Sequence, residues 1–175
     1  MVLVLLLILV CGVLEVTRVL YLINTLQVVT ARAAAAAAHT DLRNGAAMDA
    51  VRQQAVFRSS AGGLVLGAPI TDAHVRIDYL ALAGPEADML SEIPAASLPS
   101  CAANNRLTCL RNPYDASCIR LVRARICDPA DASTCRSVAH RSVFTMMPLP
   151  LQLPTAPAIA RAEGLGAGPG DAPCP

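Results

Sequence analysis

The first forty residues form an almost uninterrupted apolar run, and this run constrains the fold more than any other feature. Residues 2–14 are almost entirely apolar, and apolar positions continue from there into an alanine series that ends at Ala38. No proline interrupts this stretch, and Asn44-Gly45 follows it as a stop signal. We therefore predict one continuous helix over residues 2–42, about 60 Å long at the usual rise per residue.

The start of this helix is expected to lie in a lipid bilayer, and its end to pack on a domain. Residues 2–14 alone span about 20 Å, which is short of the roughly 30 Å hydrocarbon core. The apolar pattern continues beyond them, however, with polar residues recurring near every seventh position, and this leaves an apolar stripe for packing. The chain is therefore interpreted as a single-pass membrane protein.

Polar residues inside this run are the candidates for helix interactions. A charge near the bilayer centre costs about 2.5–3.5 kcal/mol, so Glu15 and Arg18 are candidate functional residues by default. Alternatively, they form an i,i+3 ion pair near the outer interface, with Arg18 extending toward water. Glu15, Arg18 and Asn24 are the residues through which we expect the helix to contact other helices.

Seven cysteines indicate the compartment. Cys11 lies in the apolar run, and the six others lie beyond it: Cys101, Cys109, Cys118, Cys127, Cys135 and Cys174. Their even number and long spacings favour disulfides over zinc, which usually requires close ligand pairs. Because disulfides persist outside the cytoplasm, the domain is predicted to face an oxidising compartment.

Beyond the long helix, the sequence predicts a short helix and three β-strands. Helix-forming residues at 46–58 indicate the helix, and alternating polar and apolar residues indicate strands at 74–80, 119–127 and 136–146. Prolines from Pro148 onward exclude a central strand there. The predicted fold class is α+β: a long N-terminal transmembrane helix packed on a small antiparallel sheet, as in a pilin, and stapled by disulfides.

The last two predicted strands suggest one disulfide. Residues 128–134 are expected to form a hairpin loop between them, with Cys127 and Cys135 at the two strand ends. Directly opposed residues bring their Cβ atoms to about 4.5–5.5 Å, close to disulfide distance, so a Cys127–Cys135 bridge is predicted. The pairing of the other four cysteines beyond the helix stays open. Residues 84–99 and 101–117 are predicted to be loops.

These elements divide the chain into three parts. Residues 1–42 form the transmembrane and amphipathic helix, residues 43–160 the α+β domain, and residues 161–175 a flexible tail rich in Gly, Pro and Ala.

The sequence offers no catalytic constellation. His140 and Ser142 share one face of a predicted strand, but alternation alone puts them there, and no G-x-S-x-G motif accompanies them. The net charge of +1 gives no basic face for nucleic acid. We therefore predict a protein that is not an enzyme and takes no cofactor, metal or nucleic acid.

The helix pattern resembles that of the TadE-like proteins. Their pattern is an apolar span, Glu-Phe-Gly-Arg, an apolar pair, and Asn-Ala-Leu-Gln before Ala-Arg repeats. Glu15, Arg18, Asn24 and Gln27 stand at the matching positions of this chain. Further along, a Pro-Leu-Pro-Leu stretch from residue 148 and Arg-Ala-Glu from Arg161 fit the family more loosely.

The resemblance implies a minor pseudopilin of the tight-adherence (Flp) pilus system. Such a protein sits in the bacterial inner membrane with its C-terminal domain in the periplasm, and it assists assembly of a fibre for surface adhesion. Its partners would be other pseudopilins, inner-membrane platform proteins and the lipid bilayer. The Gly and Glu of a prepilin peptidase site are not found in the apolar run, so Glu15 is not assigned that role.

Two other interpretations stay open. In one, the helix is only a signal anchor for a periplasmic binding module unrelated to pili. In the other, cleavage within the alanine series releases a secreted domain that begins at His39. The basic residues Arg18, Arg32 and Arg43 all follow the span, which favours a cytoplasmic domain, whereas the cysteines favour the opposite side.

Overall fold

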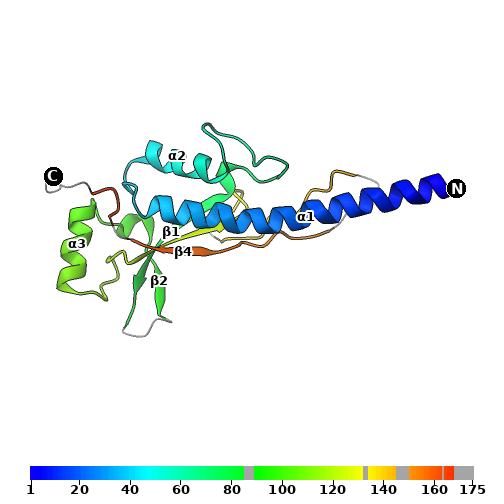
Figure 1. Ribbon diagram of the computed structural model, residues 1–175. Coiled ribbons are helices and arrows are strands. Elements are labelled where there is room, and N and C mark those ends of the chain that lie inside the picture. Colours follow the sequence, from blue (N-terminus) through cyan, green and yellow to red (C-terminus); the bar gives the residue numbers. More distant parts are fainter. Residues whose placement is uncertain (85–88, 132–133, 145–149, 163, 168–175) are drawn as a thin grey trace.

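The computed structural model describes residues 1–84, 89–131, 134–144, 150–162 and 164–167. Its elements, in chain order, are α1 (Val2–Ala37), α2 (Gly45–Ala55), the 3-10 helix η1 (Asp72–His74), β1 (Val75–Leu82), β2 (Leu90–Glu92), the 3-10 helix η2 (Ala95–Ser97), α3 (Ala102–Arg111), β3 (Leu121–Ile126) and β4 (Ala158–Arg161). Figure 1 shows that α1 lies along the domain and projects far beyond it at the N-terminal end. The predicted α+β class is confirmed.

The sheet has four antiparallel strands in the order β2-β1-β3-β4. The central pair runs from Val75 opposite Ile126 to Leu80 opposite Leu121. The edge strand β4 pairs with the first four residues of β3, from Leu121 opposite Arg161 to Ala124 opposite Ala158. The two edge strands are short, so most of the inner surface belongs to β1 and β3.

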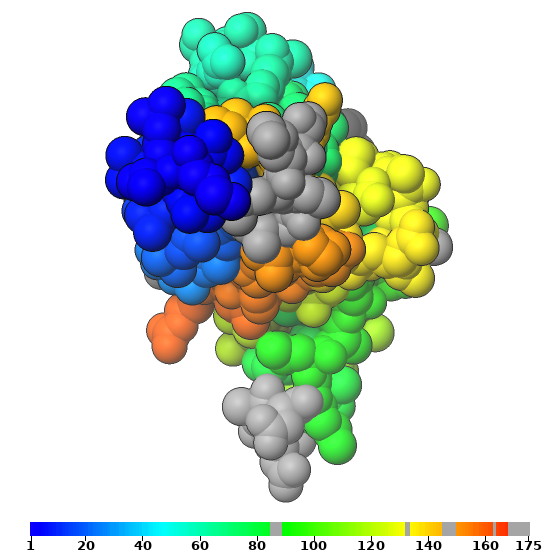
Figure 2. All heavy atoms as spheres, turned by 90° about the vertical axis from the view of Figure 1, so that its right-hand side faces the viewer, coloured from blue at the N-terminus to red at the C-terminus, as the bar shows by residue number. Residues whose placement is uncertain are grey.

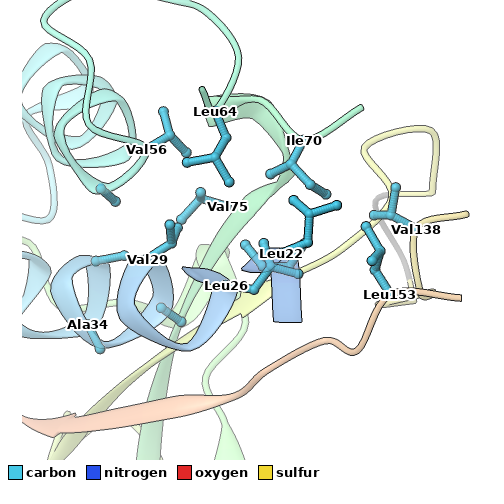
Figure 3. Packing of buried hydrophobic residues seen from close by; sticks show 14 residues of the cluster. Leu22, Leu26, Val29, Ala34, Val56, Leu64, Ile70, Val75, Val138 and Leu153 are labelled. Carbon is cyan, nitrogen blue, oxygen red and sulfur yellow. The ribbon is translucent and has the colours of Figure 1, made fainter. Parts of the chain in front are cut away.

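The second half of α1 covers this inner surface. Leu22, Leu26, Val29 and Ala33 recur at helical spacing and are fully buried. Figure 3 shows the first three of them facing side chains from α2, the loop before β1, and β1 itself. A sheet this small does not bury enough apolar surface to be stable alone, so α1 is part of the domain core and not an appendage.

The opposite face of the sheet carries a network of ion pairs. The buried Asp78 carboxylate on β1 accepts from Arg76 Nε at 2.9 Å and from Arg125 Nη2 at 2.6 Å. Arg123 Nη2 donates to Glu92 Oε2 at 2.7 Å. Because these residues come from three strands, the network ties β2, β1 and β3 together.

The long helix ends earlier than predicted. α1 stops at Ala37, and residues 38–44 turn the chain into α2. Asn44, predicted as a stop signal for the first helix, instead begins the second, because its side-chain oxygen accepts from the Ala47 N–H at 3.0 Å. Asn is a favoured N-cap residue as well as a helix terminator, and its capping role prevails here.

The predicted loop at 101–117 is wrong over most of its length, since it contains α3. The Asn105 side chain in α3 is buried and bonds both backbone groups of Ile119, at 2.8 and 3.2 Å. This contact holds α3 against the segment before β3, and the Ala, Leu and Arg residues of α3 favour a helix despite the two asparagines. The loop predicted at 84–99 likewise contains β2 and η2.

The predicted strand at 136–146 is also wrong for the part that the structure describes. Residues 136–144 contain no strand, and Ala139 forms only an isolated bridge with Gln152. The strand beside β3 is β4, which begins directly after Pro157 and lies at the sheet edge. Residues 145–146 lie outside the described part of the chain.

Truncating the covered face of α1 should destabilise the domain. Leu26→Ala removes a fully buried side chain, so we expect a loss of about 2–5 kcal/mol in the free energy of unfolding. Thermal unfolding of the full chain in a mild detergent measures this loss. Leu20→Ala is the matched control, because Leu20 is 56% exposed on the same helix. Equal losses in both variants would show that α1 is not part of the core.

Candidate functional site

The N-terminal part of α1 is an apolar surface that the domain leaves uncovered. Leu3, Leu6 and Leu9 are 68%, 57% and 63% exposed. The helix is long and apolar enough to cross a membrane, and only 11% of its most apolar stretch is buried. A helix of a soluble core would bury most of such a stretch, so this surface requires an apolar environment.

Glu15 is the first residue of α1 that the domain encloses. Its side chain is 1% exposed, and Oε1 lies 2.8 Å from Nε2 of His140. Oε2 accepts from the backbone N–H of Val143 at 3.2 Å. The carboxylate thus holds the segment around residues 140–143 against the helix.

Arg18, one turn further along, fastens two loops to the helix. Its Nε donates to the Leu66 carbonyl at 3.1 Å, and Nη2 donates to the Ala68 carbonyl at 2.8 Å. Nη1 donates to the Arg141 carbonyl at 2.8 Å and lies 3.5 Å from Glu15 Oε1. A planar guanidinium with five N–H donors suits this role, because it serves several acceptors from one position.

These contacts form the junction between α1 and the domain, which we define as Glu15, Arg18, His140 and the Val143 amide. The i,i+3 proximity of Glu15 and Arg18 expected from the sequence is present, but it is the longest contact of the junction. The stronger contacts join residues more than forty positions apart. Such partners lie beyond any local sequence pattern, so sequence analysis identified Glu15 and Arg18 without identifying what they contact.

Asn24, the third candidate residue, lies outside the junction. It is exposed on the side of α1 that faces away from the domain, and its amide donates to the carbonyl of Leu20 at 3.0 Å. Exposed residues continue along this side at helical spacing. We call this side the outer face of α1; its members are Val13, Leu20, Asn24, Val28, Ala31 and Ala35.

The structure pairs Cys127 with Cys135, as the sequence predicted, with the two Cα atoms 4.8 Å apart. It also pairs Cys109 with Cys118, which fastens α3 to the segment before β3. Cys101 is disulfide-bonded as well, whereas Cys174 lies outside the described residues. Each closed loop restricts the unfolded chain and so stabilises a domain with a small core.

His74 contacts the backbone at the start of the 3-10 helix η1. Burial lowers the pKa of His74, whose Nδ1 accepts from the Thr71 backbone N–H at 3.1 Å. His74 borders an open groove of about 750 Å³ between α2 and β1, which is lined by charged residues of both signs. Among the residues that the structure describes, no cluster of three or more His, Cys, Asp or Glu side chains is arranged to hold a metal ion.

Comparison of the chain with protein-family models, with curated proteins and with solved structures found no match.

Breaking the junction should loosen the segment around residues 140–143. Glu15→Leu leaves the buried His140 ring and the Val143 N–H without their acceptor, which costs about 1–3 kcal/mol for an unsatisfied buried group. Hydrogen exchange of the full chain in detergent should show faster exchange at the Val143 amide.

The control for this measurement is Thr17→Val. The Thr17 hydroxyl is exposed and bonds only the Val13 carbonyl of its own helix in the described contacts. This variant should leave exchange at Val143 unchanged. Unchanged exchange in Glu15→Leu as well would contradict the proposed role of the carboxylate.

Proposed function

We propose that this chain is a non-enzymatic, membrane-anchored, pseudopilin-like component that assists assembly of a tight-adherence (Flp) pilus for surface adhesion. The proposal rests on the observation that α1 has two distinct sides, one buried in the domain and one uncovered. One side of its second half forms the domain core, while its N-terminal part and its outer face stay uncovered along the whole length. The uncovered face beside the domain carries the apolar residues Leu20 and Val28, whereas the solvent side of a helix that served only as a tether is typically polar.

The disulfides support a location outside the cytoplasm. Cys109–Cys118 and Cys127–Cys135 are closed pairs, and such bonds persist in oxidising compartments. The proposed arrangement therefore has α1 in the bacterial inner membrane and the domain in the periplasm. There, the outer face of α1 is free to pack against the helices of other pilus components.

The character of the outer face suits helix packing. Small residues at Ala31 and Ala35 allow close approach of a second helix, while Leu20 and Val28 are 56% and 49% exposed. Asn24 lies in the middle of this face, and a polar residue in such a seam sets the register of the partners. Partner contacts are therefore proposed to centre on Asn24, with Glu15 and Arg18 positioning the domain on the helix.

Adding bulk to the outer face should impair assembly. Ala31→Leu places a large side chain where a neighbouring helix would approach, without touching the buried side of α1. In the bacterium that carries the gene, we expect fewer surface pili and less co-purification of pilus components from solubilised membranes. The amount of the variant in the membrane fraction should stay the same.

Ala46→Leu is the matched control, since Ala46 is also an exposed alanine in a helix, α2, away from the outer face. It should leave piliation unchanged. If Ala31→Leu also leaves piliation and co-purification unchanged, α1 acts as a plain anchor. The protein would then be better described as a signal-anchored periplasmic binding module, with the charged groove between α2 and β1 as its candidate site.

A further inference from the structure

The turn between α2 and β1 has a composition that is unusual for its position. Val65 and Leu66 are its two central residues, because the Gly67 N–H donates to the Leu64 carbonyl at 2.9 Å. Such tips are usually polar or contain Gly, yet these two apolar side chains are 56% and 75% exposed. The turn therefore displays apolar surface where a fully solvated loop would not.

The backbone of the turn makes this composition more unusual. Leu66 has φ of 54°, in the left-handed region that favours Gly or Asn at the third position of a turn. A leucine there is strained as well as exposed. Strain of this kind persists where the surroundings hold it and commonly marks a binding site.

The α1 helix holds this turn rigidly. Arg18 binds the Leu66 and Ala68 carbonyls at 3.1 and 2.8 Å, and the Tyr21 hydroxyl lies 3.4 Å from the Val65 carbonyl. The backbone polar groups thus face the helix, which leaves the Val65 and Leu66 side chains directed outward.

A second apolar tip lies beside the same turn of α1. Val143 is 60% exposed, and its backbone N–H is bound by Glu15. Its neighbour Arg141 is exposed too, and its carbonyl accepts from Arg18. In Figure 2, which looks onto the end from which α1 projects, the gold segment adjoins the blue helix and the turquoise segment lies above it. We call Val65, Leu66 and Val143 the apolar collar.

The collar lies beside the exposed apolar part of α1, at the turn that also carries Glu15, Thr17 and Arg18. The exposed apolar residues of the helix extend up to Leu14, and the collar is fastened at the next turn by Glu15 and Arg18. Tyr21, 43% exposed, and Arg141 accompany it, and both residue types favour the boundary between lipid and water.

We propose that the apolar collar inserts into the boundary region of the same lipid bilayer that holds α1, giving the domain a second membrane contact and a fixed height. This inference rests on the proposed membrane anchoring by α1 and not on the pilus function. Two loops and one helix then contact the bilayer, so the domain and α1 together cannot tilt freely relative to the membrane.

The absence of tryptophan from the sequence makes the collar directly testable. Single-tryptophan variants of the full chain, Leu66→Trp and Val143→Trp, are reconstituted in vesicles of phosphatidylcholine and phosphatidylglycerol. Some vesicles carry phosphatidylcholine brominated at the upper part of the acyl chain, which quenches nearby tryptophan. We expect both variants to show blue-shifted tryptophan emission, and we expect most of the emission intensity to be lost in the brominated vesicles.

Two matched variants complete the experiment. Leu6→Trp reports on insertion of α1 and should be quenched. Leu110→Trp is the control for exposure alone, since Leu110 is 81% exposed on α3, at the end of the domain away from the projecting helix. It should emit as in water and remain unquenched.

The outcomes separate the collar from the anchor. Quenching of Leu6→Trp without quenching of the collar variants would overturn the collar and leave the anchor intact. Loss of quenching in all variants would overturn both. Blue-shifted but unquenched emission from the collar variants would also overturn the proposal, because protein and not lipid would then cover the collar.

Discussion

The burial of one side of α1 under the domain is the interaction on which the rest of the structure depends. Leu22, Leu26 and Val29 fill the space between the sheet, α2 and the loop before β1. A sheet of four strands, two of them short, offers too little apolar surface to fold without this helix. Release of a domain beginning at His39 would remove these side chains, so the structure argues strongly against a stable secreted form.

Elsewhere the small core is supplemented by cross-links. The ion pairs around Asp78 connect three strands on the face that α1 does not cover, and charges joined in such a network contribute more than isolated surface pairs. The disulfides stabilise the domain in a different way, by lowering the entropy of the unfolded chain. Both devices are typical of domains whose hydrophobic core is limited.

The sequence predicted the elements whose signals are local. The apolar run predicted α1, and alternation predicted β1 and β3. The Cys127–Cys135 bridge was also predicted correctly, although the second strand of the hairpin on which that prediction rested is absent from residues 136–144. Sequence analysis did not predict the features that depend on contacts between residues far apart in the chain. α3 is held in place by Asn105 bonding Ile119, β4 is a short strand rich in alanine, and the partner of Glu15 lies 125 positions away at His140. No periodicity encodes such contacts, because they arise only once the chain has folded.

The junction also changes how the charges in the apolar run are understood. An isolated carboxylate in a membrane helix would require a partner from another protein, since leaving it unpaired in lipid costs several kcal/mol, about 2.5–3.5 on insertion scales. Here the same chain supplies His140 and the Val143 amide to Glu15, and three carbonyls to Arg18. Glu15 and Arg18 therefore do not require partners on a second helix. The surface proposed for contact with a second helix is instead the outer face of α1, where Leu20 and Val28 beside Asn24 are about half exposed. In the proposed function, contacts with other proteins and attachment of the domain to its helix lie on opposite sides of α1.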